Sequence, residues 1–259
     1  MPSARGNALA QLLGGNWDER SDLGRIVGYL AKTLSDLLGQ VTQLNFTDAG
    51  DPSVVILGPY LARGIPEVGF AILLARPDPF RVLVLRQVQQ PPDYEIDIRN
   101  TCALQWKGDF LAEEKVESLW KASRKPRAMT RALLGDYHDH VFWRPGLLSF
   151  LDRLPDERGG QWLSTLRLIS PDTFTAQMRS RAERAYTACS KGVHHEFVIP
   201  HSAYFDSQQM KALHTEVLEI SATLGLVFNS GRHVPFCHGR EEALTQFEEI
   251  QALTQEING

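Results

Sequence analysis

The C-terminal third of the chain gathers most of its histidines. Six of the eight lie between His194 and His238, and two of the three cysteines, Cys189 and Cys237, flank or enter this span. Imidazole and thiolate are the usual ligands of zinc and similar metals. The clustering therefore predicts a metal site in this part of the chain.

Two short extended segments would bring these ligands together. On a strand over residues 193–199, alternate side chains share a face, so His194 and Glu196 would point the same way. If a second extended piece around residues 233–238 is its neighbour in a sheet, the two sets converge. The predicted metal ligands are His194, Glu196, His233 and His238, with Cys237 as an alternate. Two histidines and a carboxylate with an open position suit a catalytic zinc or non-haem iron.

This ligand set predicts a metal-dependent enzyme, with zinc or iron as its cofactor. Hydrolysis by metal-bound water is the default chemistry of such a site. The order of His194, Glu196, His233 and Arg240 also resembles the ligand pattern of iron-dependent oxygenases. Glu196 and Arg240 are the expected catalytic residues, and Arg232 or Arg240 would bind an anionic group of the substrate.

A second set of residues points to nucleic-acid cleavage. Asp97 lies on one predicted strand, and Gln105 and Lys107 lie two apart on the next, followed by a helix. This order resembles the core of the PD-(D/E)XK nucleases, in which acidic residues hold Mg²⁺ and a lysine supports the attacking water. The resemblance implies a nuclease centred on Asp97, Gln105 and Lys107, with Gln105 standing where the family has a carboxylate.

Cations gather in two short stretches, five within residues 121–131 and three within 179–184. Phosphate or RNA could dock there by charge alone. Because the whole chain has a net charge of −4, solvated surfaces are the preferred interpretation and nucleic acid is not favoured as a partner. The alternative to an enzyme is a non-enzymatic binding or regulatory protein whose antiparallel sheet binds an unknown small molecule or protein.

The elements that must position these residues are predicted to form an α+β fold. A stripe of apolar residues from Leu23 to Leu38 predicts an N-terminal helix over about residues 21–38. Apolar runs between Gly/Pro turns predict a six-strand antiparallel meander. The predicted strands are 41–46, 53–57, 68–75, 80–87, 94–98 and 102–106. After short helical pieces, including one around Val116–Trp120, a small C-terminal α/β layer follows. It comprises helices at 172–189, 206–224 and 239–257 and strands at 193–199 and 226–228.

Three segments result: residues 1–107 with the helix and sheet, a helical connector over 108–170, and the α/β layer over 171–259, packed as one compact domain. The longest apolar run, Val68–Ala75, is far shorter than the ~20 residues of a membrane-spanning helix. Three widely separated cysteines favour reduced thiols. We expect a soluble cytoplasmic protein that does not contact membranes.

Overall fold

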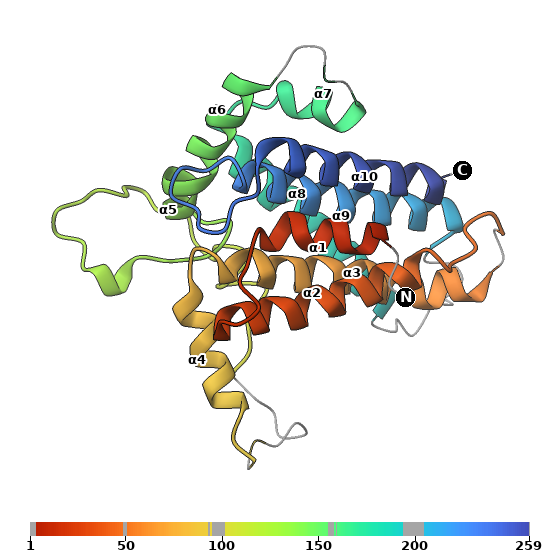
Figure 1. The fold of residues 1–259 in the computed structure, drawn as a ribbon, viewed down its shortest axis with the longest axis horizontal. Coiled ribbons are helices and arrows are strands. Elements are labelled where there is room, and N and C mark those ends of the chain that lie inside the picture. Colours follow the sequence, from red (N-terminus) through yellow and green to blue (C-terminus); the bar gives the residue numbers. More distant parts are fainter. Residues whose placement is uncertain are drawn as a thin grey trace.

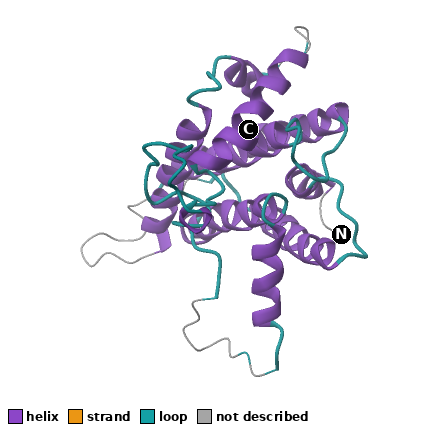
Figure 2. Ribbon diagram, turned by 90° about the vertical axis from the view of Figure 1, so that its left-hand side faces the viewer, coloured by secondary structure: helices purple, strands orange, loops and turns teal. Residues whose placement is uncertain are grey.

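Helices account for all regular structure in the computed structural model, which describes residues 4–48, 51–92, 94, 102–154, 158, 160–193 and 205–258 (Figures 1 and 2). Two isolated β-bridges, Lys107–Leu111 and Leu111–Leu134, are the nearest approach to a sheet in those ranges. The predicted α+β class, with its six-strand antiparallel meander and C-terminal α/β layer, is therefore wrong.

Long helices lying side by side form the body of the molecule (Figure 1). They are α1 (Ala4–Gly14), α2 (Asp22–Val41), α3 (Pro52–Ala75), α8 (Phe174–Val193), α9 (Ser207–Phe228) and α10 (Arg240–Asn258). Shorter elements surround them: α4 (Pro79–Gln89), η1 (Pro126–Ala128), α5 (Asp136–His138), η2 (Asp139–Trp143), α6 (Arg144–Arg153) and α7 (Gln161–Arg167). Helix α1 packs against α2, α9 and α10, so both ends of the chain contribute to one apolar core. The boundaries of the three predicted segments stay a prediction.

Residues 52–75, in which two strands were predicted, form the central helix α3. It packs against α2, α8 and α9 and buries apolar residues around most of its circumference, so its sequence lacks the periodicity of an amphipathic helix. Pro59 and Pro66 lie inside the helix, where each removes a backbone donor, and they imitate the turn signals of a meander. A continuous apolar run such as 68–75 suits a buried helix as well as a buried strand.

Helix α3 is also long and apolar enough to cross a membrane by length and composition. Of the most apolar 18-residue stretch of α3, 61% is buried inside the bundle. A core helix meets the same criterion, and the cytoplasmic location stays a prediction.

The predicted strand at 80–87 is the projecting helix α4 (Figure 2), in which only Val82 is buried. Its start is encoded locally, because Asp78 accepts a hydrogen bond from the Arg81 backbone at 3.2 Å and Pro79 occupies the first turn. Four successive apolar residues, Val82–Leu85, resemble a strand in the sequence, but the cap and the proline favour a helix.

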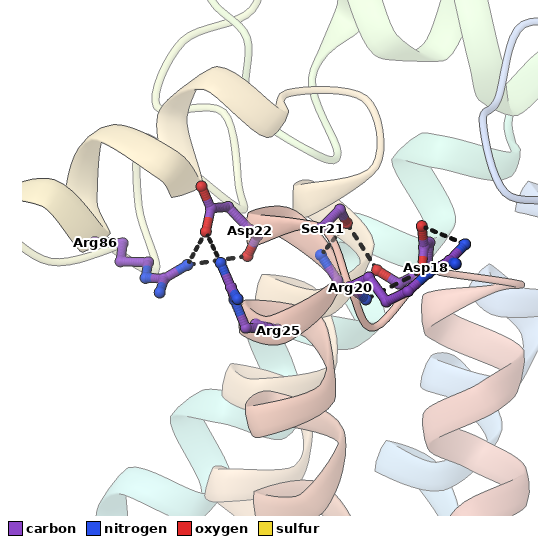
Figure 3. A network of polar contacts seen from close by, with 7 residues as sticks. Asp18, Arg20, Ser21, Asp22, Arg25 and Arg86 are labelled. Atoms are coloured by element: carbon purple, nitrogen blue, oxygen red, sulfur yellow. Dashed lines mark hydrogen bonds and ion pairs between the residues drawn. The ribbon is translucent and has the colours of Figure 1, made fainter.

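A polar network at the start of α2 holds α4 in place (Figure 3). Arg86 of α4 donates to the Asp22 carboxylate at 3.1 Å and to the Asp22 carbonyl at 3.2 Å. Ser21, next to Asp22, caps α2 by accepting from the Gly24 backbone at 2.9 Å. The network joins α4 to the N-terminal end of α2.

The helices predicted at 21–38, 172–189, 206–224 and 239–257 are confirmed as α2, α8, α9 and α10, with bounds shifted by a few residues. The predicted strand at 226–228 is wrong, because α9 continues through Gly225. A Cβ on Gly225 would lie 2.9 Å from Leu12 Cγ, so glycine serves helix packing there and is not a stop signal. The helix expected around Val116–Trp120 is a loop. Residues 95–98 and 194–199 of two predicted strands lie outside the described ranges.

Candidate functional site

The described members of the predicted metal set lie on one loop and not on a sheet. His233 and His238 belong to residues 229–239, which connect α9 to α10 and are called the pocket loop below. His194 and Glu196 fall outside the described residues, so their approach to this loop stays a prediction.

His238 faces oxygen atoms with both ring nitrogens. Nδ1 lies 3.1 Å from Glu242 Oε1, and Nε2 lies 3.0 Å from the Gln11 carbonyl oxygen. Both ring nitrogens of His238 therefore already face a partner within the protein. His233 is exposed on the loop surface.

Among the residues that the structure describes, no group of three His, Cys, Asp or Glu side chains could hold a metal ion. The hypothesis of a metal-dependent hydrolase is therefore wrong, and so is the alternative of a partner-binding antiparallel sheet, since the described chain forms no sheet. The zinc or iron cofactor stays a prediction without support from these residues.

The nuclease arrangement is not formed either. Asp97 lies outside the described ranges, and Gln105 and Lys107 lie on a loop after α4. The Gln105 backbone donates to Asp109 at 2.8 Å, and Lys107 pairs with Glu183 at 3.6 Å. The predicted strand that would carry Gln105 and Lys107 is replaced by this loop.

A cavity of about 370 Å³ lies beside the pocket loop. Its walls come from the end of α6, the end of α9, the pocket loop and the start of α10. Three arginines line it, Arg153, Arg232 and Arg240, together with His238 and Cys237, and no carboxylate does. The cavity is therefore strongly cationic.

The three arginines are not neutralised by neighbours. No ion pair joins them to any acidic residue within the described ranges. The Nε and Nη2 atoms of Arg240 are buried, and no described residue forms a hydrogen bond with either of them. A buried donor without a partner is unfavourable by about 1–3 kcal/mol, more when it is charged. Such an atom commonly marks the place of a bound ion or water.

Arg76 adds a positive charge behind the wall of the cavity. Its side chain is 1% exposed and contacts two lining residues, with Nη2 at 3.2 Å from Asn229 Oδ1 and at 3.5 Å from Cys237 Sγ. Burial lowers the pKa of Arg76 to about 10, which leaves it charged at neutral pH. Burial also raises the pKa of the Cys237 thiol, so this thiol does not neutralise Arg76.

Asn229 fixes the pocket loop to the bundle. Its Nδ2 donates to the carbonyl oxygens of Leu12 at 2.7 Å and Gly225 at 2.9 Å. Its Oδ1 accepts from the His238 backbone at 3.0 Å and from Arg76 at 3.2 Å. One side chain thus ties both ends of the loop to α1 and α9, which makes the cavity wall rigid.

The acidic residues at the start of α10 do not enter the cavity. Glu242 pairs with His238, and Glu241 pairs with Arg158. The cavity therefore meets the first turn of a 19-residue helix, where free N–H groups favour an anion.

The histidine clustering pointed to the pocket loop that lines this cavity, but the described residues form no metal site there. Arg232 and Arg240 were singled out for an anionic group, and both line the cavity. Arg153, Arg76 and Asn229 were missed, because no local pattern marks them and they meet the loop only in the folded chain.

Comparison with known proteins gives no relative: no family model, no curated protein and no solved structure matches this chain. The function is therefore inferred from the geometry of the site.

Proposed function

We propose that this protein binds a small phosphorylated molecule in the cavity beside the pocket loop. The observation that carries the proposal is the buried, unpartnered guanidinium edge of Arg240, in a cavity that Arg153 and Arg232 also line. An anion placed there would satisfy the orphaned donors and neutralise the clustered charge.

Phosphate fits this arrangement better than a single carboxylate does. Each guanidinium presents a planar fork of donors that matches two oxygens of a phosphate, and a phosphate monoester can carry two negative charges. The start of α10 offers backbone N–H groups in addition. A volume of about 370 Å³ leaves room for a small organic group beyond the phosphate, at the lower end of the usual range for ligand sites.

Pyrophosphate titration of the full chain in a chloride buffer tests the proposal, with calorimetry and thermal unfolding as readouts. At ten times its Kd, the anion stabilises the protein by about 1.4 kcal/mol, which raises Tm by roughly 3–6 °C. Arg240→Gln is expected to weaken binding about tenfold or more, because it removes charged hydrogen bonds.

Arg184→Gln is the matched control, because it makes the same chemical change at an exposed position on α8 outside the cavity. Its affinity for pyrophosphate should equal that of the unmodified protein. An unchanged Tm up to about 10 mM pyrophosphate, or equal binding by the folded triple variant of Arg153, Arg232 and Arg240 to Gln, would refute the proposal.

A further inference from the structure

A loop leaves the body of the molecule between Leu111 and Ala132 (Figure 1), and the second half of its sequence is rich in cations. Residues 120–131, called the basic segment below, contain no acidic residue. We infer that the basic segment binds single-stranded nucleic acid, as a site separate from the arginine-lined cavity.

The charge of the basic segment is largely uncompensated. Arg131 pairs with Asp78 at 3.5 Å. The other four cations form no ion pair with an acidic residue in the described ranges: Lys121, Arg124, Lys125 and Arg127. Four free positive charges within seven residues stand out on a chain whose net charge is −4. Contacts of this kind with backbone phosphates release counterions and drive binding.

An exposed aromatic ring begins the segment. The side chain of Trp120 is 61% exposed, although large apolar side chains are usually buried. Its ring lies 5.0 Å from the His140 ring and 5.9 Å from the Tyr137 ring, both in edge-to-face geometry. Tyr137 also donates from its hydroxyl to the Leu119 carbonyl at 3.2 Å. These contacts hold the indole in place while most of its surface remains open to solvent.

A second anchor fixes the loop before Trp120. The Val116 backbone donates to Asp136 Oδ2 at 2.7 Å, which ties the loop to the start of α5. Trp120 is therefore exposed at a defined position beside the cations, and a preformed platform loses little conformational entropy when it binds.

This combination favours a single strand over a duplex or a membrane. Unpaired bases stack on an aromatic face while cations follow the backbone, as in many single-strand binding proteins. Bases in a duplex are already stacked and offer no free face. Insertion into a lipid surface commonly uses an amphipathic helix with a continuous apolar face, and the basic segment holds only the short helix η1. Attraction of the cations to anionic lipid headgroups is tested separately below.

Fluorescence anisotropy with labelled oligouridylate and oligothymidylate of about 12 nucleotides tests the inference on the full chain. Four phosphate contacts predict a slope of about −2.8 for log K against log salt concentration. Trp120→Ala should weaken binding about fivefold or more, through loss of one stacked base. Changing Lys121, Arg124, Lys125 and Arg127 together to Gln should bring the salt slope close to zero.

The charge-matched control changes Arg20, Lys32, Arg184 and Lys191 to Gln, which are exposed residues outside the basic segment. It should bind the oligonucleotides like the unmodified protein. Equal losses in both quadruple variants, equal affinity for a duplex of the same length, or tighter binding to vesicles of anionic phospholipid would each overturn the inference. Arg240→Gln should leave oligonucleotide binding unchanged, which keeps this site distinct from the cavity.

Discussion

Replacement of Asn229 by alanine should destabilise the protein by about 3 kcal/mol. The substitution removes four side-chain hydrogen bonds: one to α1, one to α9, one to the His238 backbone within the pocket loop and one to Arg76 at the end of α3. The Gly225 carbonyl still accepts from the residue 229 backbone at 3.1 Å, so it keeps a partner. The groups left without their partner are the Leu12 carbonyl, the His238 N–H and one N–H of Arg76.

The expected magnitude follows from these three orphaned groups. Each is unfavourable by about 1 kcal/mol when it loses its partner in a buried or half-buried setting, and more when the donor is charged. Their sum is about 3 kcal/mol, which lowers Tm by roughly 6–12 °C in a chain of this size.

Urea unfolding followed by circular dichroism measures this change, and thermal unfolding gives a second estimate. Ser230→Ala is the neighbouring control, because its hydroxyl makes one long hydrogen bond of 3.5 Å, to the Leu226 carbonyl. This control should change stability by less than about 0.5 kcal/mol. A loss below about 1 kcal/mol in the Asn229 variant would show that the pocket loop is held by other contacts.

Two further predictions concern the core and the turn before α2. Burial lowers the pKa of His214 to about 4, so the unfolded chain binds a proton that the folded chain does not bind between pH 6.5 and 4. From His214 alone, the free energy of unfolding should decrease by about 1.4 kcal/mol for each pH unit by which the pH is lowered through this range. Urea unfolding at pH 7 and pH 5 should therefore show a smaller loss of stability for His214→Leu than for the unmodified protein. Equal losses in the two proteins would contradict the assignment. Gly15→Ala should destabilise by about 2 kcal/mol or more, because Gly15 has φ +70° and a Cβ would lie 1.8 Å from the Phe236 carbonyl oxygen. Gly39→Ala, a helical position with open space, should instead stabilise by up to about 1 kcal/mol, and similar urea midpoints for the two variants would refute the steric argument.

The amphipathic helices were predictable because their signals are local. Helix α2 carries an apolar stripe and a serine cap, and α9 begins with a capping box at Asp206 and Gln209. Such patterns need only neighbouring residues, and the structure confirms the helices they predict. His214 lies among the apolar residues of α9 and is fully buried.

The interpretation of α3 failed because burial on most sides removes the periodicity that separates helix from strand. Its two prolines look like turn signals in isolation, and only the surrounding helices α2, α8 and α9 stabilise a helix through them. The same ambiguity affected α4, whose apolar run suggested a strand although the structure forms a helix with one buried residue, Val82.

The contacts of the residues on the pocket loop depend on distant parts of the chain. The clustered histidines and arginines pointed to the pocket loop, but one ring nitrogen of His238 contacts the carbonyl oxygen of Gln11, which lies 227 residues earlier in the chain. Arg76 reaches the loop across 161 residues at Cys237, and Asn229 reaches Leu12 across 217. Periodicity and caps are properties of neighbouring residues, whereas the state of a buried polar group depends on whichever atoms the folded chain places beside it.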